Sequence, residues 1–286
     1  MGQGLLGKNP ATKKLFGEAR EILGFDLLQL CLSGPAEQLN RTEFSQPALF
    51  VHSLAAFGNL LEERPQLWES VQSVAGLSLG EYTAVTAAGG LSFADGLRLV
   101  QTRGLAMQAA ADQIASGMSS IIGLDVEKLQ EVCRQATIET EFAEVANLLC
   151  PGNIAISGHL SAIERAEKAA LEAGAAKAVR LAVAGAFHTA IMQPAVTRLS
   201  EALQSAQFHK TRVPVYSNVD AQPHQEPDEI RGLLARQVVS PVLWEQTLRH
   251  LLAAGHDPFI EIGAGKVLAG TLKRVERKAV CESIGD

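Results

Sequence analysis

A G-x-S-x-G motif ends the stretch Ser73-Val74-Ala75-Gly76-Leu77-Ser78-Leu79-Gly80. The apolar residues at its start predict a short buried strand, and the residues after Ser78 predict a helix that ends at Gly89-Gly90. Between a strand and a helix, this motif holds a serine on a strained turn that lifts its hydroxyl out of the sheet. The following helix would offer the N–H of Leu79 to a developing oxyanion. The pattern therefore predicts a nucleophilic Ser78, with a tight structural turn as the alternative.

Helices and short strands alternate on both sides of this motif. The sequence predicts one helix from Pro10 to Gly24, a second that Pro47 opens, and a long third helix capped by Ser92. After the middle of the chain we expect a helix from about Thr189, a strand at 213–217, a helix that ends near 254 and a strand at 258–262. This alternation predicts an α/β fold with a mostly parallel sheet.

The segment 117–184 has a pattern of its own. Its expected elements are a strand at 119–124, a helix at 126–136, strands at 144–149 and 153–158, a helix at 161–173 and a strand at 177–184. This βαββαβ order is that of a ferredoxin-like domain. We therefore expect a ferredoxin-like subdomain at 117–184, inserted into a large α/β catalytic domain that comprises residues 1–116 and 185–286.

His188 and Arg103 are two further candidate site residues. A serine nucleophile needs a base, and His188 follows an apparent strand through the small residues Ala184-Gly185-Ala186 and precedes a helix. Strand ends of this kind carry the active sites of α/β folds, although a histidine in an ordinary surface or core position remains the alternative. Arg103 lies on an apolar helix face. It would snorkel, pair with a buried carboxylate such as Glu81, or bind the carboxylate of a substrate.

Composition excludes several classes of protein. The 286 residues are 47% hydrophobic, and their formal charge of 25 − 31 = −6 comes without a basic block, which argues against a nucleic-acid partner. The four cysteines lack C-x-x-C spacing, and no metal-ligand spacing occurs, so we expect neither a disulfide framework nor a metal site. No apolar stretch is long enough to suggest a membrane span, and we expect a cytoplasmic protein.

Several motifs together resemble the malonyl-CoA:acyl carrier protein transacylases of fatty acid synthesis. They extend over nearly the whole chain in the order of that family, which is more specific than any one motif. The matches are Gly76-Leu77-Ser78-Leu79-Gly80-Glu81-Tyr82, Gln101-Thr102-Arg103-Gly104, Asn147 ahead of Cys150-Pro151-Gly152-Asn153, Ile156-Ser157-Gly158-His159, Gly185-Ala186-Phe187-His188, Tyr216-Ser217-Asn218-Val219, Gln237 with Ser240-Pro241-Val242-Leu243-Trp244, and Glu261-Ile262-Gly263-Ala264-Gly265.

The resemblance implies an α/β-hydrolase-like large domain and a role for each matched residue. Ser78 would be the acylated nucleophile and His188 its base, oriented by main-chain carbonyls in place of a triad carboxylate. Arg103 would hold the free carboxylate of malonate, and Gln237 would place that carboxylate or support the histidine loop. Asn147 and the amide of Leu79 would complete the substrate site. Malonyl-CoA and acyl carrier protein are then partners of a monomeric enzyme, without a bound cofactor.

Two departures from the family pattern leave alternatives open. Leu77 replaces a histidine that is often found before the nucleophile. This replacement should have little effect on activity, because attack on the thioester does not need that side chain. Family members begin with an apolar strand and a glutamine-bearing oxyanion loop, whereas Gly2-Gln3-Gly4 has no strand before it and matches a later segment. We therefore expect weak activity and low stability from this chain, and a more stable and active form when an upstream strand and loop are added. A longer start could carry a mitochondrial transit peptide. The rival functions are a thioesterase or esterase that uses the same serine, and an impaired homologue that binds carrier protein.

Overall fold

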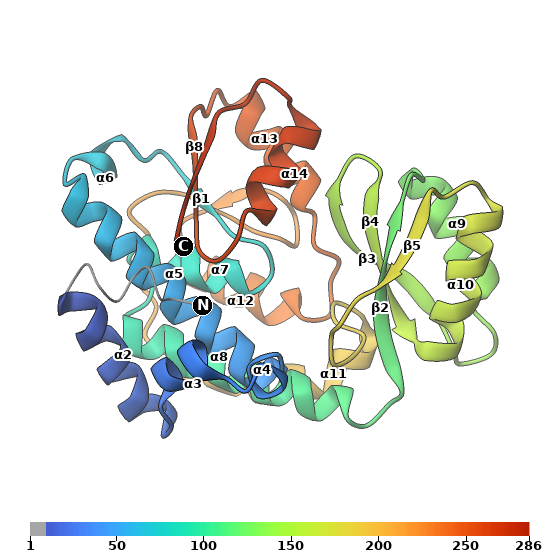
Figure 1. The fold of residues 1–286 in the computed structure, drawn as a ribbon, viewed down its shortest axis with the longest axis horizontal. Helices are drawn as coiled ribbons and strands as arrows, with labels where there is room; N and C mark the ends of the chain where they lie inside the picture. Colours follow the sequence, from blue (N-terminus) through green and yellow to red (C-terminus); the bar gives the residue numbers. More distant parts are fainter. Residues whose placement is uncertain (1–9, 286) are drawn as a thin grey trace.

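A computed structural model describes residues 10–285 of the chain. Figure 1 shows a larger group of helices and short strands beside a smaller group, coloured green to yellow, that begins with β2 (Ser116–Ile122) and ends with β5 (Lys177–Arg180). The fold is α/β with both parallel and antiparallel strand pairs. None of the helices in the described range is long and apolar enough to cross a membrane. The residues Gly2-Gln3-Gly4, on which the expected loss of an oxyanion loop depends, lie outside the described range.

Helices of the larger group pack around α8 (Phe93–Ala111), which contacts α2 (Pro10–Leu23), α5 (Thr42–Glu63) and α11 (Gln193–Ser205). The limits expected for two of them are confirmed. Gly24 adopts a φ of 79° directly after α2, and the hydroxyl of Ser92 accepts a hydrogen bond from the amide of Asp95 at the start of α8. The shorter helices α3 (Leu27–Ser33) and α4 (Ala36–Leu39) connect α2 to α5, and α6 (Leu67–Ser70) lies between α5 and the first strand.

The expected helix start at Pro47 is wrong, because α5 begins at Thr42 and contains the proline. Pro47 has no N–H to donate to the carbonyl four residues before it, which weakens a helix interior. Pro47 is buried here together with Phe50 and Val51 on the same helix. Burial of this apolar surface against neighbouring helices offsets the lost hydrogen bond, so the proline does not mark the beginning of the helix.

The larger group contains two pairs of parallel strands. One pair is β1 (Val74–Ala75) with β6 (Val215–Tyr216), to which β7 (Pro223–His224) adds an antiparallel edge; the other is β8 (Phe259–Ile262) with β9 (Cys281–Ile284). The helix α7 (Leu79–Ala87) leaves the end of β1, and α12 (Pro227–Gln237), α13 (Trp244–Ala253) and α14 (Val267–Val275) complete this part.

The smaller group forms one four-stranded antiparallel sheet in the order β3-β4-β2-β5. Its other elements are α9 (Val126–Ala136), β3 (Ala143–Cys150), β4 (Asn153–His159) and α10 (Leu160–Glu172). In Figure 1 both helices lie on the outer side of this sheet. Leu129 of α9 and Ile163 of α10 are completely buried in a core that these elements share, separate from the larger core.

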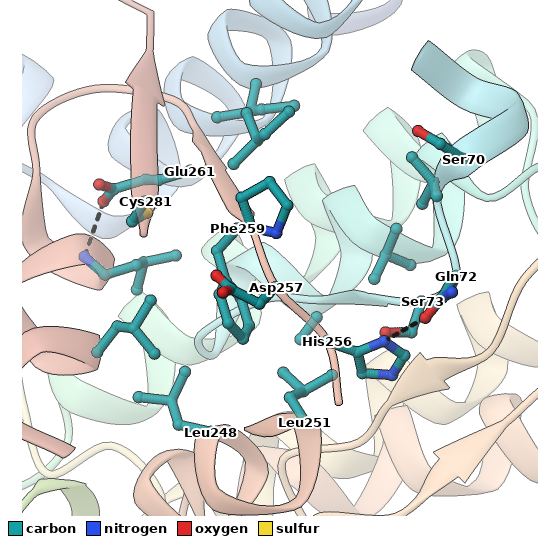
Figure 2. Close-up of a pocket in the computed structure, with 18 of the residues that line it drawn as sticks. Ser70, Gln72, Ser73, Leu248, Leu251, His256, Asp257, Phe259, Glu261 and Cys281 are labelled. Carbon is teal, nitrogen blue, oxygen red and sulfur yellow. Dashed lines mark hydrogen bonds between the residues drawn. The ribbon is translucent and has the colours of Figure 1, made fainter. Parts of the chain in front are cut away.

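A cavity of about 430 Å³ is lined by residues of both β1 and β8 (Figure 2). Apolar side chains such as Leu248 and Leu251 line it, and the Nδ1 atom of His256 lies 2.8 Å from the Oε1 atom of Gln72 at its side. On the side of β8 that faces β9, the amide of Phe259 donates to the main-chain oxygen of Val280, directly before β9. The residues of the candidate active site do not line this space.

Candidate active site

Ser78 stands on the sharp turn between β1 and α7, with a φ of 50° and a ψ of −103°. The turn requires a residue without a side chain two positions earlier, because a Cβ atom on Gly76 would lie 2.0 Å from the carbonyl carbon of Gly80. Gly80 itself has room for a side chain, since a Cβ atom there would meet nothing within 4 Å. Close packing at Gly76 therefore forces the strand and helix together and presents the Ser78 side chain at the end of β1.

The hydroxyl of Ser78 lies 2.9 Å from the Nε2 atom of His188, although 110 residues separate the two in the chain. The other ring nitrogen of His188, Nδ1, lies 2.9 Å from the main-chain carbonyl oxygen of Gln237. A carbonyl only accepts hydrogen bonds, so Nδ1 carries the proton and Nε2 is free to accept the proton of Ser78. This arrangement is that of a serine with its general base.

Burial and the nearby positive charge of Arg103 lower the pKa of His188 to about 4, while the contact with the Gln237 carbonyl acts in the opposite direction. The imidazole is therefore neutral and able to accept a proton throughout the physiological pH range. A histidine with an unperturbed pKa of about 6.5 would lose this ability on mild acidification.

This shift predicts an unusual pH profile. The rate at which a fluorophosphonate probe modifies Ser78 should stay almost constant from pH 8 to about pH 5, and should halve only near pH 4. Stopped-time labelling across this range, followed by peptide mapping, measures the profile. A midpoint near pH 6.5 would show that the histidine is not held in this buried, positively charged environment.

Arg103 is 1% exposed and lies beside the nucleophile. Its Nη2 group donates to the Ser78 hydroxyl at 2.9 Å and to the Oε1 atom of Gln237 at 3.0 Å, and its Nη1 group donates to the Oε1 atom of Gln46 at 2.7 Å. The guanidinium group also lies 5.5 Å from the centre of the Tyr82 ring. Among residues 10–285 no carboxylate forms an ion pair with Arg103, so neither snorkelling nor direct pairing with Glu81 describes it.

Gln237 contacts Ser78, His188 and Arg103. Its Nε2 group donates to the main-chain oxygen of Ser78 at 3.0 Å and to the Oε2 atom of Glu81 at 2.6 Å, while its Oε1 atom accepts from Arg103. Together with its main-chain contact to His188, these bonds make this buried residue the common support of Ser78, His188 and Arg103.

The chain is also similar in sequence to known proteins. A family model described as acyl transferase domain matches residues 1–286. The chain belongs to the acyl transferase domain family. A malonyl CoA-acyl carrier protein transacylase of Bacillus subtilis is 41% identical over 286 residues, which cover 100% of this chain and 89% of the relative.

Solved structures agree with this acyl transferase domain throughout its length. An acyl-carrier-protein-S-malonyltransferase of Bartonella henselae has a TM-score of 0.95 and 36% identity, covering 100% of this chain and 91% of that structure. A malonyl-transacylase solved in complex with its type II PKS acyl-carrier protein has a TM-score of 0.93 and 35% identity, again covering 100% and 91%.

The remaining two sequence-predicted residues of the acyl transferase domain occupy different positions. The amide of Leu79 begins α7 directly beside Ser78 and donates no hydrogen bond to a described residue, so it is available to an oxyanion. Asn147 lies on β3 beside Val242 and is 8% exposed, and its Oδ1 atom has no partner within the described part. Among the described residues no hydrogen bond joins Asn147 to Ser78, His188 or Arg103, so its place in the substrate site stays a prediction.

Three residues of the acyl transferase site were not assigned their contacts from the sequence. Gln46 of α5 binds Arg103, and Asn218, which follows β6, accepts from the amide of Ser78 at 2.6 Å and donates to the carbonyl oxygen of Gly76 at 2.7 Å. The sequence suggests Glu81 only as an ion-pair partner of Arg103. A signal existed for Asn218, since a polar residue just after a buried strand lies at the sheet edge where α/β active sites form.

Proposed function

We propose that this chain transfers the malonyl group from malonyl-CoA to the phosphopantetheine thiol of acyl carrier protein, through a malonyl-serine intermediate, in fatty acid biosynthesis. The observation that carries this proposal is the pair of 2.9 Å contacts from the Ser78 hydroxyl to His188 and to Arg103. A general base and a buried cation at one nucleophile suit an acyl group that carries its own negative charge. The names of the relatives point to the same substrate and acceptor.

The first half-reaction forms the acyl-enzyme. The Ser78 oxygen attacks the thioester carbonyl while Nε2 of His188 accepts the hydroxyl proton. The N–H of Leu79 stabilises the oxyanion that develops on the carbonyl oxygen. The carbon–sulfur bond then breaks, and His188 returns the proton to the departing thiolate, which leaves as coenzyme A. Ser78 retains the malonyl group as an ester.

The second half-reaction repeats these steps with a different thiol. Neutral His188 accepts the proton of the phosphopantetheine thiol, and the thiolate attacks the malonyl ester. The bond from the carbonyl carbon to the Ser78 oxygen breaks, and the proton on His188 returns to that oxygen. Water in place of the thiol would give a thioesterase, so the outcome depends on access of the carrier protein.

Arg103 provides the selectivity in this proposal. The guanidinium of Arg103 is buried and forms no ion pair within residues 10–285, so an incoming carboxylate can pair with it by a two-pronged contact. Gln237 holds the guanidinium from one side and Gln46 from the other.

We assign Asn147 to the same substrate site because its unpartnered buried oxygen can accept a hydrogen bond from the substrate.

We propose that the chain consists of two domains. We assign residues 1–116 and 185–286 to an α/β-hydrolase-like catalytic domain and 117–184 to a ferredoxin-like subdomain, supported by the strand order β3-β4-β2-β5 and the separate core of that segment. We further propose a monomer in the cytoplasm, with the mitochondrial matrix as the alternative compartment.

Incubation with radiolabelled malonyl-CoA tests the function. We expect label on the peptide that contains Ser78, and its transfer to carrier protein when that is added. Release of free malonate at the same rate with and without carrier protein would identify a thioesterase. Absence of any labelled peptide, combined with binding to carrier protein, would identify an impaired homologue.

Arg103→Ala should reduce malonyl transfer much more than acetyl transfer, since the substitution removes the proposed partner of the malonyl carboxylate. The decisive measurement is the ratio of kcat/KM for malonyl-CoA to that for acetyl-CoA. Equal losses for both substrates would make Arg103 a structural residue. Arg98→Ala, on the exposed side of the same helix, is the matched control and should leave the ratio unchanged.

A further inference from the structure

Glu81 is the one carboxylate in direct contact with the hydrogen-bond network behind Ser78, within the part of the chain that the structure describes. It lies in the first turn of α7 and is 2% exposed. Its Oε2 atom accepts from the Nε2 group of Gln237 at 2.6 Å and from the amide of Asn218 at 3.1 Å. Glu81 takes no chemical step in the two half-reactions, because it touches neither the nucleophile nor the base.

The contacts of Glu81 determine which way the amide of Gln237 faces. Both N–H groups of that amide have acceptors, one in Glu81 and one in the main-chain oxygen of Ser78. The amide oxygen therefore faces Arg103. A rotation of the amide by 180° would direct its N–H groups at the guanidinium and its oxygen at the carboxylate, so that donors face donors and acceptors face acceptors.

Gln237 also keeps two buried charges apart. Glu81 and Arg103 both contact this neutral amide on opposite sides and form no ion pair with each other. Direct contact would neutralise the guanidinium and remove its attraction for a substrate carboxylate. Burial raises the pKa of Glu81 to about 7, so a proton on this group is accessible at neutral pH, yet the short contact to Gln237 requires that Oε2 remain an acceptor.

We propose that Glu81 is a positioning residue for acyl selectivity: through the amide of Gln237 it fixes Arg103 in the orientation that receives a carboxylate. This inference rests on the proposed malonyl transfer and deepens it. In this proposal Arg103 recognises the carboxylate, and Glu81 keeps Arg103 in place. Asn218, which also accepts from the amide of Ser78, connects Glu81 to the turn of the nucleophile, so some loss for every acyl group is expected.

The experiment compares three variants. Glu81→Met removes both acceptor oxygens at similar size, Glu81→Gln keeps one acceptor oxygen, and Glu261→Met makes the same change at another buried glutamate. Glu261 accepts from the amides of Leu268 and Ala269 at the start of α14, away from Ser78. It therefore controls for the general effect of deleting a buried carboxylate.

We expect Glu81→Met to lower the malonyl-to-acetyl ratio of kcat/KM by about ten-fold or more, the scale of one lost hydrogen bond to a charged group. Glu81→Gln should keep the ratio within about three-fold of the unsubstituted chain, a difference well below one such bond. Glu261→Met should lower the thermal midpoint without changing the ratio. Equal losses for both acyl groups in Glu81→Met would overturn the proposal.

A second readout does not need turnover. In ¹⁵N-resolved NMR spectra the side-chain amide protons of Gln237 should exchange slowly with solvent in the unsubstituted chain and in Glu81→Gln. In Glu81→Met the amide proton that faces residue 81 should exchange at least about ten-fold faster, because its acceptor is lost, whereas the other proton keeps the main-chain oxygen of Ser78. Unchanged exchange would disprove the positioning role even if the chain transferred no malonyl group. Absence of malonyl labelling with the expected exchange pattern would instead disprove the proposed function alone.

Discussion

Ser78→Ala should accept no radiolabel from malonyl-CoA. No other residue of the described chain combines a strand-to-helix turn, a hydroxyl and a 2.9 Å contact to a neutral histidine. Without the Oγ atom there is no oxygen to form the ester, so the loss is complete and not partial. Labelling followed by peptide mapping and mass analysis measures it.

The matched control for this prediction is Ser120→Ala. That serine lies on β2 and its hydroxyl donates to the side chain of Asn153, remote from the turn. The Ser120→Ala chain should take up as much label as the unsubstituted chain does. Label of comparable amount on the Ser78→Ala chain, at any position, would remove the assignment of the nucleophile.

His188→Ala should slow acylation by about 10²–10⁴-fold, the usual contribution of a positioned general base. The substitution removes the acceptor that lies 2.9 Å from the Ser78 hydroxyl, and leaves a proton that only water can take. Single-turnover labelling at saturating malonyl-CoA separates this step from transfer to the carrier protein. Imidazole added at high concentration should restore part of the rate, since it fits the space that the side chain leaves.

His224→Ala provides the comparison, because this histidine contacts Asp220 and Glu229 and no residue of the site. Its rate should match that of the unsubstituted chain. A near-normal rate for His188→Ala would assign the base to another group and would also remove the explanation of the flat pH profile.

Local signals were enough to predict the turn at Ser78 and much of the fold around it. Gly76 has no side chain and so permits the close approach to Gly80 that the turn needs, and Gly24 and Ser92 act within one helical turn of their own positions. The order of strands and helices in 117–184 was also predictable from the sequence, because each element there has a buried apolar face of its own. The strand expected at 177–184 nevertheless ends at Arg180, after which the amide of Leu181 donates one further hydrogen bond to Met118 of β2.

The contacts of the neutral side chains were not predictable from local patterns, although the family resemblance implied a place for Gln237 in the site. Gln46 meets Arg103 across 57 positions, Gln237 meets it across 134, and Asn218 meets Ser78 across 140. An amide has no periodicity or charge that reveals its partner, and only the packing of three distant elements brings these groups within hydrogen-bond distance. The same packing places an amide between Glu81 and Arg103, where the sequence suggested an ion pair.

The backbone conformation of Ser78 and His188 has an evolutionary consequence. Both residues have positive φ angles, 50° and 63°, in a region that residues with a Cβ atom rarely occupy. Each such residue costs about 1–3 kcal/mol of folding free energy. Selection for catalysis therefore maintains a serine where folding alone would favour glycine. In related chains released from that selection, glycine at the position of Ser78 should be among the earliest changes to spread, and it would mark descendants that have kept the fold but lost the chemistry.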